Sequence, residues 1–540
     1  MKNTPISLKS LLLNANKALA EKKYSEGKSI LEKINSLNPN VFEVNYNLGL
    51  INLKLNNLDD AAINFEKAIK LNPKLSHVYF NLGLVYDRKK DFNLAIKNFQ
   101  KVIEIDPNNS HAFYNLGSLY QEIFKRTEAE KHLKKSIELN PKFLLAYNNL
   151  FDVYDRSNQT EKFRELLSEV KKNFDETNLL SFYSGMYEYK NKNYELAIHS
   201  LQNIKLKEEF FIQDIKRHGM LAKSYDFLKD YEKAFNHFEL NNNLTNKFYG
   251  KNIDENIYLK YVNQRINFFK NFKQTNWNVD STQNEVNSPY FLIGFPRSGT
   301  TLLDTILRTH HTVEVIEEKP LIRNFLIKLE KKTKNNFNHL NNLDDDFIKE
   351  MQNFYFFERK KYIKNINTKI IIDKLPLNII HIGEILRFFP NAKFILALRH
   401  PYDSVLSCFM QQFTLNPAMK NFLTINGGAY LYDLVMSLWE IYTNNFSVNF
   451  HSIRYEDLVS NFETETKKVF KYLKLEWNDN IKDFHLTAKN RTDISTPSYD
   501  QVTSPIYSRS ISRWNNYEKR FENEKKYLDK WVKKFNYKIN

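Results

Sequence analysis

Residues 289–307 read PYFLIGFPRSGTTLLDTIL and contain an apolar run, a glycine-containing loop and a helical pattern in that order. The run YFLI predicts a buried strand, and TLLDTIL predicts a helix. Gly294 to Thr301 fits the Walker phosphate loop G-x-x-x-x-G-K-[ST], except that Thr300 replaces the lysine and Arg297 lies inside the loop. The stretch therefore predicts an α/β domain with an anion site at the N-terminus of a helix.

The loop offers three kinds of ligand for a phosphate group. Backbone N–H groups at the start of the helix point at the anion, hydroxyl groups add hydrogen-bond donors, and the arginine supplies the charge that the missing lysine would have given. The candidate ligands are Pro296, Arg297, Ser298, Gly299, Thr300 and Thr301.

Two further apolar runs end in polar residues. The run AKFILAL at 392–398 is followed by Arg399 and, on the helix after it, by Ser407, and the run III at 370–372 is followed by Asp373 and Lys374. Ligands of parallel α/β sheets bind at the carboxyl ends of the strands. The pattern therefore predicts a parallel sheet and a ligand with two separate phosphate groups.

These motifs resemble those of the sulfotransferases. The segment 296–301 reads PRSGTT, and Arg399 with Ser407 matches an R-x7-S motif about 100 residues later. The resemblance implies that the donor is 3′-phosphoadenosine 5′-phosphosulfate. It also implies that the first loop holds the 5′-phosphosulfate and that Arg399 and Ser407 hold the 3′-phosphate.

Within this family the chain is most similar to the tyrosylprotein sulfotransferases. Glu317 and Glu318 follow the first loop as the G-E-E of those enzymes does, although Ile316 replaces the glycine, and Glu318 lies 21 residues after Arg297. The resemblance implies that Glu318 is the general base and that the favoured acceptor is a protein tyrosine. Adjacent side chains on an extended segment point in opposite directions, so we expect only one glutamate to face the acceptor.

Other segments resemble later motifs of the family. Lys374 corresponds to a lysine that contacts the leaving group, and the histidine base of the cytosolic small-molecule branch has no counterpart at the expected spacing. Lys319 and Pro320 depart from the pattern on the acceptor side. Tyr455 and Arg513 fall in segments that resemble the donor-binding Y-E-x-L and S-K-W motifs, with Arg513 in place of lysine, and Tyr499 stands where a donor-contacting serine is expected.

The first half of the chain repeats itself at a step of 34 residues. Each unit has a Leu-Gly pair, an alanine twelve residues after the glycine, a large apolar residue four further on and a closing proline. This pattern resembles the tetratricopeptide repeat, in which each unit folds into two antiparallel helices. The matching positions are Leu48, Leu82 and Leu116; Gly49, Gly83 and Gly117; Ala61, Ala95 and Ala129; Phe65, Phe99 and Leu133; and Pro73, Pro107 and Pro141.

Weaker copies extend the repeats in both directions. Pro39 closes an earlier copy, and degenerate copies follow, the last with Ala222 and Ala234. We therefore expect about seven helical pairs that form a solenoid over 8–245, a linker over 246–288 and a sulfotransferase domain over 289–540. Such solenoids are usually peptide-binding surfaces, so a protein or peptide partner is expected on the repeats.

The composition limits the remaining possibilities. The formal charge is +16, which suits an anionic ligand or reflects a compositional bias toward lysine; the basic residues are dispersed, and no nucleic-acid partner is expected. One cysteine, Cys408, excludes an internal disulfide and fits a cytoplasmic location. The sequence contains no candidate signal peptide, membrane span or metal-ligand cluster. Chains that join such repeats to such a domain are familiar in bacteria.

Three alternatives remain open. The first is a non-catalytic nucleotide-binding scaffold. The second is a sulfotransferase whose acceptor is a glycan or small alcohol, and the third is a phosphate-loop kinase. Thr300 in place of the Walker lysine argues against the kinase.

Overall fold

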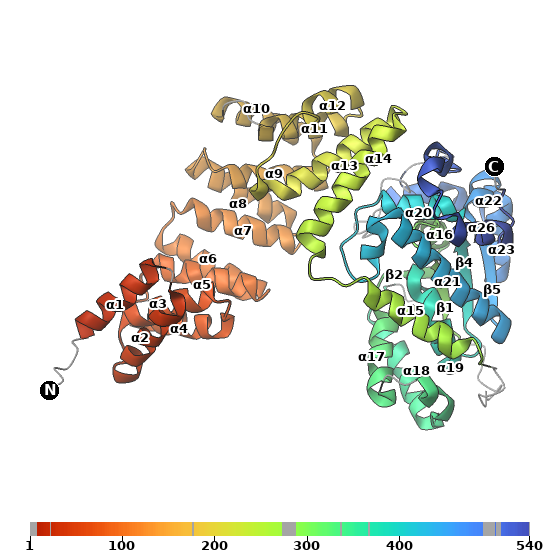
Figure 1. Cartoon of the computed structure of the whole chain (residues 1–540), viewed down its shortest axis with the longest axis horizontal. Helices are drawn as coiled ribbons and strands as arrows, with labels where there is room; N and C mark the ends of the chain where they lie inside the picture. Colours follow the sequence, from red (N-terminus) through yellow and green to blue (C-terminus); the bar gives the residue numbers. More distant parts are fainter. Residues whose placement is uncertain are drawn as a thin grey trace. The chain divides into compact units, whose positions relative to one another are not determined.

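The computed structural model describes residues 8–21, 23–174, 178–272, 288–334, 337–364, 368–489, 503 and 509–538. The chain forms two compact units, Met1–Leu206 and Lys207–Asn540. A mostly helical repeat region is followed by a parallel sheet with helices, as the sequence predicts (Figure 1).

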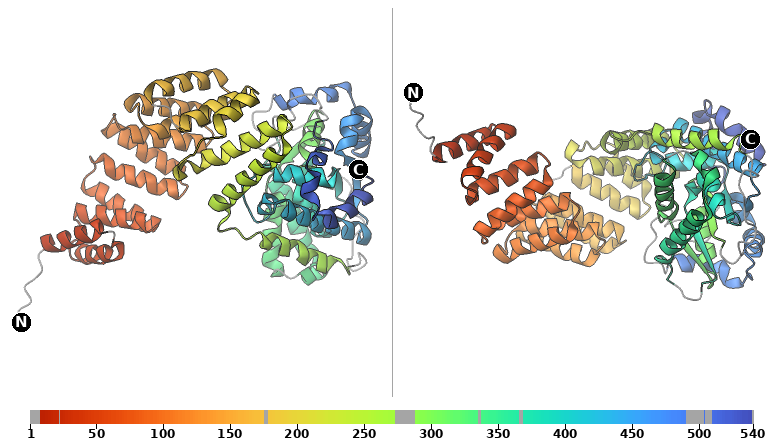
Figure 2. Two further views of the ribbon diagram at one scale, coloured as in Figure 1. Left: turned by 45° about the horizontal axis from the view of Figure 1, so that its top comes forward. Right: turned by 90° about the horizontal axis from the view of Figure 1, so that it is seen from below.

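The first unit consists of helices that pack as consecutive pairs, stacked in chain order (Figure 2). The pairs are held together by close approach of their small residues: a Cβ atom at Gly49 would lie 2.6 Å from the ring of Phe65, and Gly83 meets Phe99 in the same way. The helices are α1 (Leu8–Ala20), α2 (Tyr24–Leu37), α3 (Phe42–Lys54), α4 (Leu58–Leu71), α5 (Ser76–Arg88), α6 (Phe92–Ile105), α7 (Ser110–Glu122), α8 (Arg126–Leu139), α9 (Leu144–Arg156), α10 (Thr160–Asn173), α11 (Asn178–Lys190) and α12 (Tyr194–Leu201).

The conformation of the turns also recurs at a step of 34 residues. The predicted prolines lie just beyond the second helix of a pair, for example Pro73 after α4, because proline cannot continue a hydrogen-bonded turn. In the second to sixth pairs, the turn after the first helix contains a residue with positive φ, and the next amide donates to the carbonyl oxygen five residues back, as in Asp91 N to Tyr86 O at 2.9 Å. These positions are Asn56, Lys90, Phe124, Asn158 and Lys192.

The second unit contains a sheet of five parallel strands in the order β2-β3-β1-β4-β5 among the described residues. The strands are β1 (Tyr290–Gly294), β2 (Val313–Glu317), β3 (Ile370–Lys374), β4 (Lys393–Leu398) and β5 (Asn449–Arg454). The other elements are η1 (Glu208–Phe210), α13 (Phe211–Phe227), α14 (Tyr231–Thr245), η2 (Asn246–Gly250), α15 (Asn256–Phe269), α16 (Thr300–Arg308), α17 (Leu321–Thr333), η5 (Phe337–Asn342), α18 (Asp345–Lys360), η6 (Pro376–His381), α19 (Ile382–Phe388), α20 (Pro401–Phe409), η7 (Met419–Leu423), α21 (Ile425–Asn445), α22 (Tyr455–Ser460), α23 (Phe462–Tyr472), η8 (Asp479–Asp483), α24 (Phe484–Lys489), η9 (Arg513–Phe521) and α26 (Lys525–Lys534).

Alternate residues of the strands face two different layers. Leu292 of β1 packs with residues of α16, α22, α23 and α24, whereas its neighbour Phe291 lies against Tyr355 of α18 and Phe394 of β4, with ring centroids 6.1 and 5.5 Å apart. Helices therefore cover both faces, and in such a sheet ligands bind at the loops that follow the carboxyl ends of the strands.

The division into units differs from the boundary expected at residue 245. Helices α13 and α14 pack against the α/β core: Phe235 stacks on Phe409 at 5.0 Å, and Asn242 Nδ2 donates to the carbonyl oxygen of Phe409 at 3.0 Å. The seventh helical pair therefore exists, but it belongs to the second unit because its apolar face is buried there.

The segment expected as a linker also contains an ordered helix. Phe269 of α15 is fully buried and packs on Tyr442 of α21, and Arg265 forms an ion pair of 2.6 Å with the buried Glu384. These contacts make α15 part of the second unit; residues 273–287 lie outside the described residues.

Candidate functional site

The predicted phosphate loop connects β1 to α16. Its backbone is left-handed at Arg297 (φ 68°) and at Gly299 (φ 96°), which turns the chain so that Thr300 begins the helix. Ser298, Thr300 and Thr301 are buried, at 2%, 4% and 7% exposure. The first amides of α16 have no partner within the helix, which is the arrangement that binds an anion.

The second predicted anion site lies beside this loop because β4 is the neighbour of β1. Arg399 follows β4, and its Nη1 donates to the carbonyl oxygen of Arg297 at 3.1 Å. In return, Nε of Arg297 donates to Oγ of Ser407 on α20 at 3.1 Å. The structure thus joins two motifs that lie about 100 residues apart in the sequence.

Several buried polar atoms in these two motifs have no hydrogen-bond partner. They are Oγ of Ser298, Nε of Arg399 and Oγ of Ser404. Because a buried polar group without a partner costs free energy, such atoms gathered around a phosphate loop fit a site for a polyanionic ligand.

Tyr455 covers the loop from the end of β5. A Cβ atom at Gly299 would lie 2.9 Å from Cδ2 of Tyr455, and the guanidinium carbon of Arg399 lies 5.2 Å from the centre of the same ring. The predicted donor residues of three strand ends therefore form one cluster.

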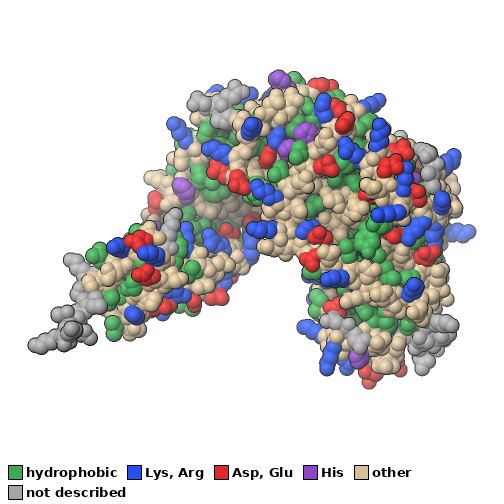
Figure 3. Space-filling model, in the orientation of Figure 1, with side chains coloured by type: hydrophobic (Ala, Val, Ile, Leu, Met, Phe, Trp, Pro, Cys, Tyr) green, Lys and Arg blue, Asp and Glu red, His purple; other side chains and the backbone are tan. Residues whose placement is uncertain are grey.

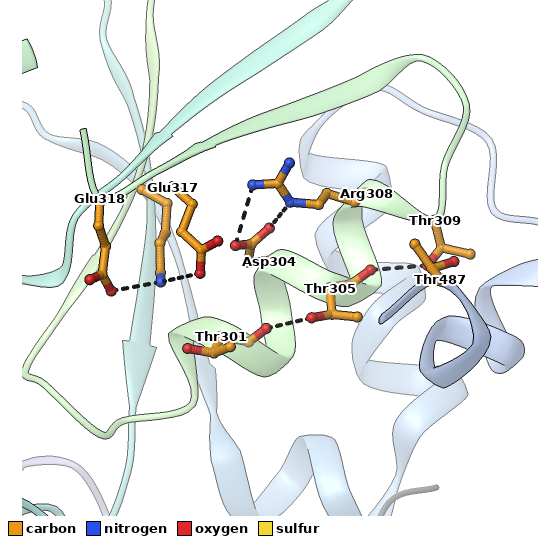
Figure 4. Close-up of polar contacts among 9 residues, drawn as sticks. Thr301, Asp304, Thr305, Arg308, Thr309, Glu317, Glu318 and Thr487 are labelled. Carbon is orange, nitrogen blue, oxygen red and sulfur yellow. Dashed lines mark hydrogen bonds and ion pairs between the residues drawn. The ribbon is translucent and has the colours of Figure 1, made fainter. Parts of the chain in front are cut away.

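Lys374 of β3 contacts both Glu317 and Glu318 at the end of β2, and the three form a second cluster; the two glutamates are labelled in Figure 4. Nζ of Lys374 lies 2.9 Å from Oε1 of Glu318 and 3.4 Å from Oε1 of Glu317. Lys374 and Glu317 are buried, whereas the side chain of Glu318 is 36% exposed. Of the three, only Glu318 therefore presents a carboxylate to solvent as well as to the lysine.

The expected opposite orientation of the two glutamates is wrong. Glu317 ends β2, but Glu318 has a φ of 50° and has left the extended conformation. The left-handed residue turns the chain, so both carboxylates reach the same ammonium group.

Helix α16 contributes a buried acid that the sequence analysis missed. Asp304 is fully buried and pairs with Arg308, while Oγ1 of Thr309 donates to Thr487 at 3.1 Å and ties the helix to α24 (Figure 4). Burial raises the pKa of Asp304, and the charges of Arg308 and Lys374 oppose this effect. An acidic residue within the apolar pattern TLLDTIL is the signal that the sequence offered.

The predicted donor residue Arg513 is engaged by an acid from α13. Its Nη2 lies 2.7 Å from Oδ2 of Asp226. The neighbouring backbone is held by Asp403, which accepts from the amides of Ser512 and Trp514 at 2.8 and 2.9 Å and whose pKa is raised by burial. Sequence reasoning missed both aspartates, and Tyr499 lies outside the described residues.

Three further features of the chain are its cysteine, its capacity to hold a metal ion and the apolar length of its helices. Cys408 is buried, its Sγ donates to the carbonyl oxygen of Pro296 at 3.4 Å, and burial raises the pKa of the thiol, so it packs as a small buried residue. Within the described ranges, no group of three or more His, Cys, Asp or Glu side chains is placed to hold a metal ion. None of the helices in this part of the chain is both long and apolar enough to cross a membrane.

The parallel sheet and its lysine-free phosphate loop define an α/β domain of the phosphate-loop class. Residues 289–479 match the Sulfotransferase family, and segments 42–75, 77–109 and 98–130 match Tetratricopeptide repeat families. The chain therefore carries tetratricopeptide repeats followed by a sulfotransferase-family domain, and it is distantly homologous to protein-tyrosine sulfotransferases.

The individual relatives named here match less than half of this chain. An uncharacterized protein of Aquifex aeolicus (strain VF5) is 28% identical over 239 residues, which cover 43% of this chain and 31% of that protein. Protein-tyrosine sulfotransferase 1 of Danio rerio is 25% identical over 235 residues, or 42% of this chain and 64% of the relative. The chain thus spans less than two thirds of each.

Similar solved structures cover a smaller part of the chain. A crystal structure of MamA protein is 21% identical and covers 30% of this chain and 91% of its own, with a TM-score of 0.29.

Proposed function

We propose that the second unit transfers a sulfuryl group from 3′-phosphoadenosine 5′-phosphosulfate to an acceptor hydroxyl group. The observation that supports this proposal is the hydrogen bond from Arg399 to the carbonyl oxygen of Arg297, beside the Lys374–Glu318 pair at the same edge of the sheet. A donor with two separate phosphate groups requires two anion sites close together, and the group that it transfers requires a base and a cation nearby.

The residues suit such a donor. The loop 296–301 holds the 5′-phosphosulfate through the amides of α16 and the hydroxyls of Ser298, Thr300 and Thr301, while Arg399 and Ser407 hold the 3′-phosphate. The unpartnered atoms of Ser298 and Arg399 gain partners when phosphate oxygens approach.

The transfer needs one proton acceptor and one group that stabilises negative charge. The acceptor oxygen forms a bond to sulfur, the bond from sulfur to the bridging phosphate oxygen breaks, and adenosine 3′,5′-bisphosphate leaves with the electron pair of that bond. The hydroxyl proton passes to Glu318, whose partly exposed carboxylate is the accessible one of the pair. Lys374 and Arg297 stabilise the charge that builds up on the bridging oxygen.

Lys374 is preorganised for this role. Its ammonium group is fully buried and held by two carboxylates, so its position is fixed before a ligand binds. Loss of one such contact in a transition state typically raises the barrier by about 3 kcal/mol, which lowers the rate by a factor of ~100 or more.

We propose a tyrosine side chain of a protein as the favoured acceptor. A protein-tyrosine sulfotransferase is among the relatives named above, and the resemblance of segment 317–318 to the G-E-E of those enzymes assigns the general base to Glu318. The tetratricopeptide repeats serve to bind the partner or the substrate, as stacked helical pairs commonly do. A glycan or small alcohol is the competing acceptor.

Calorimetry tests the donor. The full chain should bind adenosine 3′,5′-bisphosphate more tightly than ATP, and Arg399→Ala should weaken the bisphosphate strongly and adenosine 5′-phosphate only slightly. Equal or tighter binding of ATP would contradict the sulfotransferase proposal and favour a kinase.

Transfer of a labelled sulfuryl group tests the acceptor. The chain is incubated with labelled donor and a lysate, and label on protein tyrosine is expected. Label on a glycan or small alcohol would correct the acceptor, and bisphosphate binding without any transfer would identify a nucleotide-binding scaffold.

A further inference from the structure

The carboxylate of Asp226 is the centre of a buried polar cluster within the second unit. Asp226 lies near the end of α13 at 6% exposure. It accepts a hydrogen bond of 2.6 Å from the hydroxyl of Tyr517 and binds Arg513 through two atoms, Nη2 at 2.7 Å and Nε at 3.3 Å. Nη2 of Arg509 lies 3.5 Å away. One acid therefore fixes three side chains of the C-terminal segment 509–517.

The same segment is bonded to the second anion site. The carbonyl oxygen of Ser510 accepts a hydrogen bond of 2.6 Å from Nη2 of Arg399. The other terminal nitrogen of Arg399 donates to the carbonyl oxygen of Arg297 in the phosphate loop. The guanidinium group of Arg399 is therefore held between the C-terminal segment and the loop, and its Nε remains without a partner.

From this chain of contacts we propose that Asp226 is a positioning residue of the donor site. It does not touch the nucleotide. By holding Arg513 and Tyr517, it places Ser510 so that Arg399 is kept in the orientation in which it binds the 3′-phosphate. This inference rests on the proposed sulfotransferase function and adds α13, a helix with a repeat-like sequence, to the parts that determine donor affinity.

The charges support a role in positioning. Arg399 donates to Ser510 of the segment 509–517 and Arg513 belongs to that segment, so two positive charges act on the same short stretch and nearby carboxylates offset their repulsion. Asp226 pairs with Arg513, and Asp403 accepts from the amides on both sides of that residue. Charge-assisted hydrogen bonds of this kind are stronger than neutral ones and define orientation.

The test compares two nucleotides that differ only in the 3′-phosphate. For the full wild-type chain and for Asp226→Ala, the Kd of adenosine 3′,5′-bisphosphate and of adenosine 5′-phosphate is measured by calorimetry. In the variant we expect the bisphosphate to bind about tenfold more weakly or worse and the monophosphate to change little. The double variant with Arg399→Ala should be no weaker than Arg399→Ala alone, because both changes act on the same guanidinium group.

The control is Asp214→Asn on the same helix. Asp214 forms an ion pair of 2.7 Å with Arg217 and has no bond to the segment 509–517 among the described contacts. The Asp214→Asn variant should therefore leave the Kd of both nucleotides unchanged. If Asp226→Ala fails to fold, Tyr517→Phe removes one hydrogen bond to the same carboxylate and should lower affinity for the bisphosphate in the same direction by a smaller factor.

Each outcome decides the inference. A preference for the bisphosphate that is as large in Asp226→Ala and in Tyr517→Phe as in the wild type would overturn the positioning role and leave the donor proposal intact. Equal weakening of both nucleotides, or tighter binding of the bisphosphate, would also overturn it. A wild-type chain without any preference for the bisphosphate would remove the donor proposal itself and this inference with it.

Discussion

Lys374 and Glu318 are joined twice across the ends of neighbouring strands. The amide of Glu318 donates to the carbonyl oxygen of Lys374 at 2.8 Å, and the ammonium group of Lys374 lies 2.9 Å from the carboxylate of Glu318. The backbone bond extends the pairing of β2 with β3 by one residue, and the left-handed conformation of Glu318 turns its side chain back to the lysine. Residues 56 positions apart are thereby held as one unit.

Glu318→Gln tests the general base. The amide keeps the size of the side chain but has no proton affinity, so kcat should fall by ~10²–10⁴-fold while donor affinity stays nearly unchanged. The measurement is initial rate at saturating donor, together with the Kd of adenosine 3′,5′-bisphosphate.

Glu317→Gln is the matched comparison for that variant. Glu317 also contacts Lys374, but it is buried, so its loss should lower the stability of the fold more than kcat. A Glu317→Gln protein that is folded but inactive, beside an active Glu318→Gln, would move the base to Glu317.

Gly299→Ala tests the conformation of the phosphate loop. Gly299 has a φ of 96°, and an added Cβ atom would lie 2.9 Å from the ring of Tyr455. The variant should lose about 1–3 kcal/mol of stability and bind the bisphosphate more weakly, because the backbone must shift at the anion site. Thermal unfolding and calorimetry measure the two effects.

Two further variants separate the effect of the close contact with Tyr455 from the effect of the left-handed φ at Gly299. Gly428→Ala on α21 should cost less stability than Gly299→Ala, because its Cβ atom would lie 3.3 Å from Cγ1 of Val405, its φ is not left-handed, and alanine favours a helix. Tyr455→Ala combined with Gly299→Ala should recover part of the stability by removing the close contact but not the strained φ. Wild-type behaviour of Gly299→Ala would show that the loop adopts another conformation.

The buried Asp373 should make the second unit less stable as the pH rises. Burial raises its pKa from 3.8 to about 7, and Tyr355 donates to it at 3.3 Å. Between pH 3.8 and about pH 7, the carboxyl of Asp373 is ionised in the unfolded chain and still protonated in the folded chain. The free energy of unfolding therefore falls as the pH rises through this range and levels off above about pH 7. The effect is roughly 4 kcal/mol at most.

Asp373→Asn removes this titration and keeps an oxygen for Tyr355. Relative to the wild type, the variant should therefore gain stability between pH 5 and pH 8. Urea unfolding followed by tryptophan fluorescence measures it, because all five tryptophans lie within residues 207–540. Parallel pH profiles for the two proteins would show that Asp373 is ionised in the folded state.

Two fragments test where the catalytic unit begins. Residues 207–540 should fold and bind the bisphosphate, whereas 289–540 should not fold, because it lacks α15 and leaves Glu384 buried without Arg265. An unpaired buried charge typically costs 3–5 kcal/mol, and loss of Phe269 from the core adds about 2 kcal/mol. Circular dichroism checks whether each fragment folds, and calorimetry checks whether it binds the bisphosphate. A folded 289–540 with unchanged affinity would show that the domain begins at residue 289, as the sequence analysis expected.

The local patterns of the sequence predicted much of the fold. The repeats were visible because each helical pair packs mainly within itself and against its neighbours, so the same residues recur at each step of 34, as Gly49 and Gly83 show. The loop around Gly299 was visible because strand, turn and helix follow each other within 19 residues.

The sequence by itself determined the repeat architecture, the phosphate loop and the residue types of the candidate site, because these depend on neighbours in the chain. The tertiary structure alone decided that α13–α15 belong with the α/β core, that both glutamates reach Lys374, and that Asp226 holds Arg513. Asp226 and Arg513 are 287 residues apart, so a pattern among neighbouring residues cannot reveal that they form a pair. The turn at Glu318 was equally hidden, because a left-handed glutamate carries no signal in its residue type.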